Sequence, residues 1–306
     1  VEAGSARSDT HASLMNRVIE AFPTTPRISG LTKDVKLIFV DEAQDLSPQY
    51  LEFLKKIMSA NPGARLFAVG DDRQAINGFA GSDVSLFETL PERISPCRDM
   101  ALTTCHRSAR LVVSAGNRVM AGESHPARPR PDAKEGSVLL RRLSLPVRKT
   151  GNRTQRPASA RSVKPWEDDL YRAVISGTVE YLSGRSGSVF LVARTNSIFG
   201  HSLPMVARAV ERALPSDARS DLEITALTAH RSKGLEADHV VILDAIKDFY
   251  PQNHPDNRIF DRIGRGTRAR HREEQCLFHV ACTRARDSMA VFTVAYREPE
   301  FAFWTR

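Results

Sequence analysis

The sequence predicts an α/β protein built on parallel sheets, and three observations lead to that fold class. Short runs of apolar and β-branched residues, such as Leu37–Val40 and Ser188–Ala193, are typical of strands buried on both faces of a parallel sheet. Segments with helical periodicity separate these runs, which is the order of βαβ units. Polar clusters follow several strands directly, where open α/β sheets bind ligands. We expect two such layers, one before about Leu102 and one after it.

The first layer is predicted to contain one βαβ unit. A helix is expected over His11–Phe22 and a buried strand over Leu37–Val40. The next helix is expected over Pro48–Ala60, because Ser47 suits the N-cap and Pro48 suits the first helical position. Arg65–Val69 is expected to be a second buried strand, joined to the first by a right-handed crossover.

The second layer is predicted to be larger. A short strand is expected at Met100–Leu102 and a helix at Ala109–Met120. Further helices are expected at Glu167–Leu182, Leu203–Leu214 and Glu273–Ala285, and further strands at Ser188–Ala193, Leu222–Leu227, Val240–Leu243 and Met289–Val294. The residues from Arg141 to Lys164 are basic and rich in Ser and Pro, so a flexible, solvated loop is expected, centred on 144–165. Contact of this loop with a nucleic-acid backbone is the alternative.

Composition favours a soluble protein with phosphate-rich partners. The chain has 306 residues, of which 41% are hydrophobic, and a formal net charge of +8. A basic surplus favours nucleic acid as a partner. No apolar run approaches the ~20 residues that span a bilayer, and the N-terminus lacks the apolar core of a signal peptide. The four cysteines form no CxxC pair, which favours reduced thiols over a zinc site. We therefore expect a cytoplasmic location and no membrane partner.

Two carboxylates stand at the end of the first predicted strand. Asp41 and Glu42 follow Val40 directly. Asp41 is suited to hold Mg²⁺, because hard cations prefer carboxylate oxygens. Glu42 could orient and deprotonate a water that attacks a γ-phosphate. A strand that ends in a solvated acidic turn is the alternative for these residues alone.

Two later loops offer further groups for phosphate chemistry. After the second strand, Gln74 carries an amide that can contact a phosphate oxygen, and Phe79 carries an aromatic face. Core packing is the alternative for Phe79. Arg107 stands at a predicted strand-to-helix junction, from which an arginine can reach an anion in a cleft. Taken alone, Arg107 would be an ordinary surface arginine.

Five polar stretches occur in one order: DEAQD, GDDRQAINGFAG, TCHRS, TAHRSKGLE and EEQCLFHVACTRA. With these motifs the sequence resembles superfamily 1 helicases of the UvrD/Rep/PcrA type, from Leu37 to about Val294. The resemblance implies two RecA-like parallel-sheet domains of a P-loop NTPase, expected at 1–104 and 105–306. It also implies ATP, Mg²⁺ and single-stranded or duplex DNA as ligands, with translocation from 3′ to 5′.

The resemblance implies a role for each matching residue. Asp41 would be the Mg²⁺ ligand, Glu42 the general base, Gln74 the γ-phosphate sensor, and Arg107 and Arg284 the arginine fingers. The nucleotide-binding residues would be Gln44, His106, Gly234 and Glu236, and the DNA-binding residues would be Phe79, Asn77, Thr228 and His230.

The sequence also departs from the family pattern. Asn77, Phe79 and Ala80 stand where the family usually has Tyr, Trp and Arg, and His106 replaces a tyrosine that stacks on adenine. No GxxxxGK[ST] phosphate loop is present. We therefore expect the first domain to be incomplete, with the phosphate loop in a missing N-terminal segment, and this chain alone to be inactive. A degenerate, non-catalytic UvrD-like module that binds nucleic acid or a protein partner is the alternative.

Overall fold

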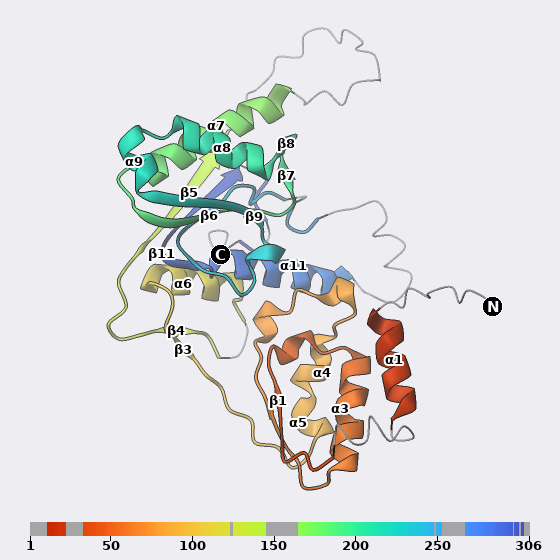
Figure 1. Ribbon diagram of the computed structural model, residues 1–306. Coiled ribbons are helices and arrows are strands. Elements are labelled where there is room, and N and C mark those ends of the chain that lie inside the picture. Colours follow the sequence, from red (N-terminus) through yellow and green to blue (C-terminus); the bar gives the residue numbers. More distant parts are fainter. Residues whose placement is uncertain are drawn as a thin grey trace, which may run out of the picture. The chain divides into compact units, whose positions relative to one another are not determined.

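The structure is a computed structural model that describes residues 11–22, 33–122, 125–144, 165–247, 249–252, 267–295, 297–299 and 301–302. The chain forms two compact units, Val1–Met100 and Ala101–Arg306 (Figure 1). Each unit is described by itself. The core of the expected basic loop, residues 145–164, lies outside the described residues. Within the described parts of the chain, no helix is long and apolar enough to cross a membrane.

Unit 1 is built around the predicted βαβ unit. Its elements are α1 (His11–Ala21), β1 (Leu37–Val40), α3 (Pro48–Ala60), β2 (Arg65–Ala68), α4 (Val84–Glu88) and α5 (Leu90–Arg93). β1 and β2 pair in parallel, with Leu37 opposite Arg65 and Val40 opposite Ala68. Ser47 caps α3 by accepting a hydrogen bond from the backbone of Tyr50 at 3.3 Å, so the predicted helix start is confirmed.

The two faces of the unit 1 sheet differ sharply in burial. Ile38, Val40, Leu66 and Ala68 pack against the core that α3 and α4 provide. On the opposite face, the side chains of Leu37, Phe39 and Phe67 are 48%, 71% and 57% exposed. The prediction of strands buried on both faces is therefore wrong for the described residues. Alternate side chains of a strand point to opposite faces, and the helices of unit 1 cover only one of them.

Unit 2 is organised on a five-stranded parallel sheet in the order β5-β11-β10-β6-β9. The strands are β5 (Ser137–Leu143), β6 (Gly187–Ala193), β9 (Leu222–Thr228), β10 (Ala237–Ile242) and β11 (Ala285–Val294). Helices α7 (Pro165–Leu182) and α8 (Leu203–Ala213) cover one face, and α6 (Arg110–Val119) and α11 (Thr267–Cys282) cover the other (Figure 1). The predicted α/β fold class with parallel sheets is thereby confirmed.

Short elements complete unit 2: β3 (Thr104–Cys105), β4 (Arg128–Pro129), β7 (Ser197–Ile198), β8 (His201–Ser202) and α9 (Ser216–Ser220). The apolar core of the sheet includes Val189, Leu191, Val241 and Phe292, all 0% exposed. Because helices cover both faces, the inner strands β10 and β11 show the nearly continuous burial that β1 and β2 lack.

Three sequence predictions need correction in unit 2. Met100–Leu102 is not a strand, and the strand β3 begins at Thr104. The strand β5 was not predicted, because its final arginines suggested a loop. The last helix was expected to run to Ala285, but it ends at Cys282 and β11 begins at Ala285. The Thr283 hydroxyl bonds the carbonyl of His279 at 2.9 Å in the last turn, and the following residues join the sheet instead.

Candidate functional site

The candidate catalytic carboxylates of unit 1 stand where β1 ends. Asp41 and Glu42 are both exposed. Glu42 has a φ of 49°, in the left-handed region that non-glycine residues rarely adopt. Asp41 Oδ1 accepts a hydrogen bond from the backbone of Glu42 at 2.8 Å. Such backbone conformations cost free energy and cluster at functional sites, so Glu42 is held in an uncommon geometry.

Gln44 connects this acidic turn to the loop after β2. Its side chain is only 1% exposed. The Gln44 amide nitrogen donates to Glu42 Oε2 at 2.5 Å, and its amide oxygen accepts from the backbone N–H of Asp71 at 2.9 Å. Gly70 makes this approach possible, because a Cβ there would lie 2.7 Å from Gln44 Oε1. The residue predicted to bind nucleotide thus contacts two protein groups.

The loop after β2 continues the same hydrogen-bonded path. Asp71 Oδ2 accepts from the Gln74 amide at 2.8 Å. Asn77 donates to Asp45 Oδ2 at 2.8 Å, which ties the two polar loops together a second time. Phe79, two residues further on, is 75% exposed, so core packing is excluded as its role in unit 1. The structure therefore brings together the predicted residues Glu42, Gln44, Gln74 and Asn77.

The site in unit 1 fits a Mg²⁺ ion that is bound largely by water and phosphate. Mg²⁺ usually keeps several waters and takes one or two protein carboxylates together with substrate phosphates. The exposed carboxylate of Asp41 offers such a ligand. Among the described residues, no group of three or more His, Cys, Asp or Glu side chains could form an all-protein cage. The exposed Asp41 carboxylate is compatible with a Mg²⁺–nucleotide complex, to which a protein usually contributes one or two carboxylates.

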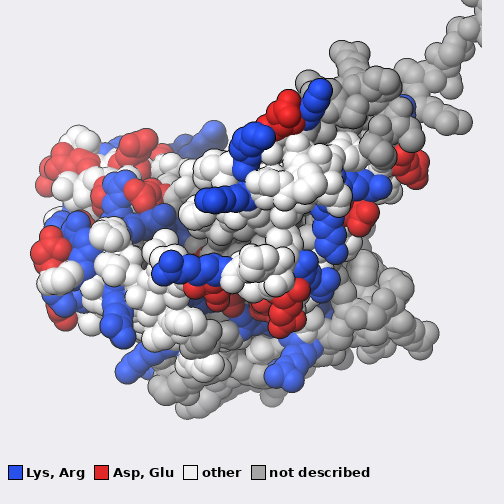
Figure 2. Space-filling model, turned by 90° about the horizontal axis from the view of Figure 1, so that it is seen from below, with Lys and Arg blue, Asp and Glu red and all other residues white. Residues whose placement is uncertain are grey.

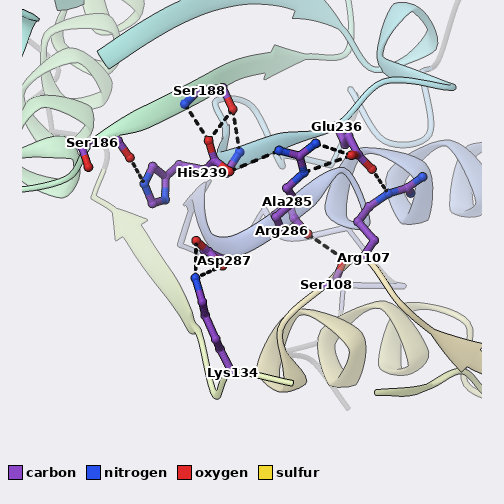
Figure 3. Close-up of polar contacts among 11 residues, drawn as sticks. Arg107, Ser108, Lys134, Ser186, Ser188, Glu236, His239, Ala285, Arg286 and Asp287 are labelled. Atoms are coloured by element: carbon purple, nitrogen blue, oxygen red, sulfur yellow. Dashed lines mark hydrogen bonds and ion pairs between the residues drawn. The ribbon is translucent and has the colours of Figure 1, made fainter. Parts of the chain in front are cut away.

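In unit 2, charged side chains meet at the amino ends of the parallel strands (Figure 3). Glu236 lies between two arginines: its Oε2 accepts from Arg107 Nε at 2.5 Å and its Oε1 from Arg286 Nε at 3.0 Å. Hydrogen bonds from Arg286 and then Arg107 lower the pKa of Glu236. Asp238 Oδ1 lies 3.5 Å from Arg286, and the pKa of Asp238 is lowered chiefly by hydrogen bonds from Ser188. The cluster is therefore ionised near neutral pH.

The two predicted arginine fingers lie in different surroundings within unit 2. Arg107 is exposed, as is its neighbour His106. Arg284 is only 1% exposed, and its guanidinium donates to the carbonyls of Val280 at 2.9 Å and Leu235 at 3.4 Å. The exposed Gly234 adopts a φ of 77°, which allows the chain to turn towards Glu236.

The predicted DNA-binding residues of unit 2 lie at the opposite, carboxyl ends of the strands. Thr228 ends β9, and His230 follows it in a 3₁₀ turn. Burial and, to a lesser degree, Arg194 lower the pKa of His230 to about 4, so its imidazole is neutral at pH 7. Arg194 forms a two-pronged ion pair with Glu274 at 2.9 and 2.5 Å. Burial raises the pKa of the nearby Asp244 to about 7.

Several residues of these sites were missed in the sequence. Asp71 connects Gln44 to Gln74, Arg286 bonds Glu236, and Asp238 contacts Arg286. The sequence offers one indication of these residues, because each lies within three positions of a predicted site residue. Nothing in the sequence indicated the partners of Arg194 and Asp244, because those contacts join distant segments.

The basic surplus of the chain is unevenly distributed. Figure 2 shows Lys and Arg side chains spread over one face, with Asp and Glu side chains among them. The segment 145–164, by contrast, contains basic residues and no acidic ones: Arg148, Lys149, Arg153, Arg156, Arg161 and Lys164. The predicted basic loop thus accounts for much of the net charge, but its structure lies outside the described residues.

Comparison with known proteins identifies the class. The UvrD/Rep helicase N-terminal domain family matches residues 7–95, and the UvrD-like helicase C-terminal domain family matches residues 206–296. The chain belongs to the UvrD/Rep helicase family, so the resemblance inferred from its five motifs is confirmed.

Individual relatives are DNA helicases by their descriptions. The chain is 24% identical to a "Probable DNA helicase" of Mycoplasma pneumoniae over 278 residues, covering 89% of this chain and 47% of that protein. It is 26% identical to DNA helicase IV of Escherichia coli K12 over 211 residues, covering 68% and 26%. The C-terminal domain of a possible DNA helicase from Lactobacillus plantarum WCFS1 aligns with 13% identity and a TM-score of 0.34, over 64% of this chain and 92% of that one. The chain spans about half or less of the length of these two curated relatives.

Proposed function

We propose that the chain supplies part of an ATP-dependent DNA helicase or translocase, which moves 3′ to 5′ on single-stranded DNA. The observation that carries this proposal is the hydrogen-bonded path in unit 1 from Glu42 through Gln44 and Asp71 to Gln74. It joins the candidate general base to the candidate phosphate sensor. Together with the family membership, this path supports a site in which the general base and the phosphate sensor act together, rather than a site that has lost catalysis.

The residues of unit 1 would act on a Mg²⁺–ATP complex, which supplies the transferable γ-phosphoryl group. Asp41 would hold the metal ion. Glu42 would accept a proton from the attacking water, and Gln44 would fix the Glu42 carboxylate by the 2.5 Å hydrogen bond. Gln74, which bonds Asp71, would respond to a γ-phosphate oxygen and pass the change along the loop.

Unit 2 would stabilise negative charge on the phosphates. Arginine fingers contribute on the order of 10³–10⁵ in rate in phosphoryl transfer. The exposed Arg107 is accessible for this role. Arg284 would have to exchange its carbonyl partners, Val280 and Leu235, for phosphate oxygens. Glu236, next to Arg107, would accept a hydrogen bond from the nucleotide sugar.

DNA would contact both units. The exposed ring of Phe79 could stack on a base, which is worth ~1–3 kcal/mol and does not depend on sequence. Thr228 and His230 would face the strand from unit 2. The low pKa of His230 keeps its ring neutral, so it would stack or hydrogen-bond rather than pair with a phosphate.

ATP binding would require a phosphate loop from outside residues 1–306. Three observations support this part of the proposal. The sequence contains no GxxxxGK[ST], and the chain covers only 47% of its Mycoplasma relative. The exposed apolar face of β1 and β2 also suits coverage by further polypeptide, because parallel sheets are normally covered on both faces.

The test is DNA-stimulated ATP hydrolysis by a longer protein that contains this chain together with a phosphate loop. Glu42→Gln removes the general base and should lower kcat at least about 100-fold. Glu52→Gln, the same change at an exposed position of α3, is the matched control and should leave kcat within about twofold. Unchanged turnover of Glu42→Gln would defeat the assignment.

The alternative is a non-catalytic UvrD-like module, which the absence of a phosphate loop within these residues favours. The same assay separates the two functions. If the longer wild-type protein binds single-stranded DNA but hydrolyses no ATP, with or without DNA, the non-catalytic module is the correct function.

Under either function, Phe79→Ala should weaken DNA binding about tenfold if the ring stacks on a base.

A further inference from the structure

The carboxylate of Glu236 is held by two guanidinium groups from distant segments (Figure 3). Arg107 Nε donates to Oε2 at 2.5 Å, and Arg286 Nε donates to Oε1 at 3.0 Å, with a second contact from the Arg286 Nη2 to the same oxygen. A carboxylate offers about four acceptor sites. The pair of bonds from Arg286 occupies Oε1, so the remaining capacity lies at Oε2, beside Arg107.

The Arg286 guanidinium also contacts a second carboxylate, that of Asp238. Its Nη1 lies 3.5 Å from Asp238 Oδ1. Asp238 Oδ2 accepts hydrogen bonds from the backbone and hydroxyl of Ser188 at 2.9 and 2.7 Å. Gly187 allows this close approach, since a Cβ there would lie 2.6 Å from Asp238 Oδ2. The guanidinium of Arg286 is thereby anchored to β6 and β10, the neighbouring strands of the sheet.

The backbone next to Arg286 holds the segment that carries Arg107. The hydroxyl of Ser108 donates to the carbonyl of Ala285 at 2.7 Å, and the N–H of Ala109 donates to the carbonyl of Arg286 at 2.7 Å. The main chain at 285–286 therefore positions the Arg107 segment, while the Arg286 side chain positions Glu236. Exposed ion pairs contribute little to stability, so the value of this network lies in its geometry.

We propose that Arg286 is a positioning residue of the nucleotide site: it fixes the Glu236 carboxylate, and through it the Arg107 guanidinium, in the orientation that nucleotide meets. Arg286 needs no contact with the nucleotide for this role. The inference rests on the proposed function, in which Arg107 and Glu236 face ATP. Arg286 follows Arg284, a predicted arginine finger, by two positions. None of the residue roles inferred above from the motifs includes Arg286.

A double-mutant cycle in the longer, ATP-hydrolysing protein tests this dependence. Arg286→Met keeps much of the side-chain volume but removes the guanidinium, and it should lower kcat/KM about tenfold. In a Glu236→Ala background the same change should cost less than about twofold, because Arg286 acts through Glu236 and residues that act as a unit are not additive. Arg286→Lys, which can keep one charged contact, should recover part of the loss. Effects of Arg286→Met and Glu236→Ala that multiply would overturn the proposal.

Lys134→Met is the matched control. Lys134 forms an exposed ion pair with Asp287, at 3.1 Å to each carboxylate oxygen, one residue beyond Arg286 in β11 (Figure 3). Its loss removes a neighbouring ion pair without touching Glu236, and kcat/KM should stay within about twofold. A loss equal to that of Arg286→Met would show a general effect of charge at this strand end and overturn the proposal.

A second measurement does not depend on hydrolysis. Phenylglyoxal modifies accessible arginines, and the rate at Arg107 can be followed by peptide mass spectrometry without nucleotide. Arg286→Met should raise that rate about threefold, because a lone exposed ion pair holds a side chain weakly. Equal rates in wild type, Lys134→Met and Arg286→Met would overturn the positioning role. If the wild-type protein hydrolyses no ATP, the proposed function fails, and this labelling result alone decides the role of Arg286.

Discussion

Asp244 and His230, which follow the carboxyl ends of β10 and β9, respond to pH in opposite ways. Burial raises the pKa of Asp244 from 3.8 to about 7, so the folded state keeps a proton that the unfolded state has lost. This carboxyl lowers stability progressively as pH rises from about 4 to 7. Burial lowers the pKa of His230 from 6.5 to about 4, so its contribution to stability is lost as pH falls through the same range.

Substitution Asp244→Asn should remove one of these two opposing responses. The backbone N–H of Arg194 bonds Asp244 Oδ1 and Oδ2 at 3.1 and 3.0 Å, and an asparagine oxygen can retain one of these bonds. The free energy of unfolding of the variant, relative to wild type, should rise by up to about 1 kcal/mol per pH unit between pH 4 and 7. Urea denaturation at several pH values measures this difference.

The control is Asp217→Asn, at an exposed position of α9. Its stability relative to wild type should show no such rise across the range. A flat difference for Asp244→Asn as well would mean that Asp244 titrates normally in the folded protein.

At the scale of single residues, the sequence indicated candidate side chains but not their hydrogen-bond partners. Glu42 and Glu236 were recognised from motifs. Their contacts with Gln44 and Arg286 were not, because a hydrogen bond depends on the path of the backbone as well as on residue type. The burial of Arg284 was likewise unpredictable, since it depends on carbonyls of Val280 and Leu235.

Among the secondary-structure elements, the junction of β2 with its polar loop is closely packed at Gly70. A Cβ at Gly70 would lie 2.7 Å from Gln44 Oε1 and 3.0 Å from the Gln44 backbone nitrogen and the Phe87 ring. Two of these three contacts are with Gln44, the buried residue that donates a hydrogen bond to Glu42. Packing at this strand end therefore connects the stability of the sheet to the geometry of the candidate base.

Gly70→Ala should consequently destabilise unit 1. Overpacking of this kind costs about 1–3 kcal/mol, and the expected result is a lower urea midpoint for unit 1. Gly63→Ala is the control, because nothing lies within 4 Å of a Cβ at that turn. Its midpoint should stay close to that of wild type. Equal midpoints for the two variants would show that Gln44 moves aside without cost.

Helices with clear periodicity and capping, and strands with uninterrupted apolar runs, were predicted well, whereas the edge strand β5 was not. The helix α3 matches its predicted bounds, Pro48–Ala60, because its cap and its apolar stripe are local signals. The edge strand β5 was missed because Arg141 and Arg142 interrupt its apolar run. Arg141 pairs with Glu180 of α7, a contact that only the folded sheet creates.

On the scale of the whole molecule, an exposed stretch of chain connects the two compact units. Residues 95–103 form no helix or strand. Met100 and Leu102 are 68% and 86% exposed. The expected boundary at residues 104 and 105 and the observed division at Met100 and Ala101 both fall at or close to this stretch.

Limited proteolysis should therefore cut between residues 95 and 103. Thermolysin cleaves before large apolar residues, and exposed, irregular chain is its preferred substrate. Met100 and Leu102 offer such sites, whereas Leu51 and Leu54 in α3 are buried and should be protected. Mass spectrometry of the early fragments measures both. Cleavage within α3 before any cut at 95–103 would contradict the division into units.

The order of strands in unit 2 has a consequence for synthesis on the ribosome. Among the described residues, β5 pairs only with β11, which separates it from β10 and is the last strand in sequence order. Unit 1 can fold as soon as its residues emerge, since synthesis proceeds from the N-terminus and domains fold as units. The strands β6, β9 and β10 can pair before β11 leaves the exit tunnel, but β5 has no neighbouring strand of this sheet until then. Nascent chains that end before Ala285 should therefore present an unpaired β5 to chaperones, while those that reach Val294 should not.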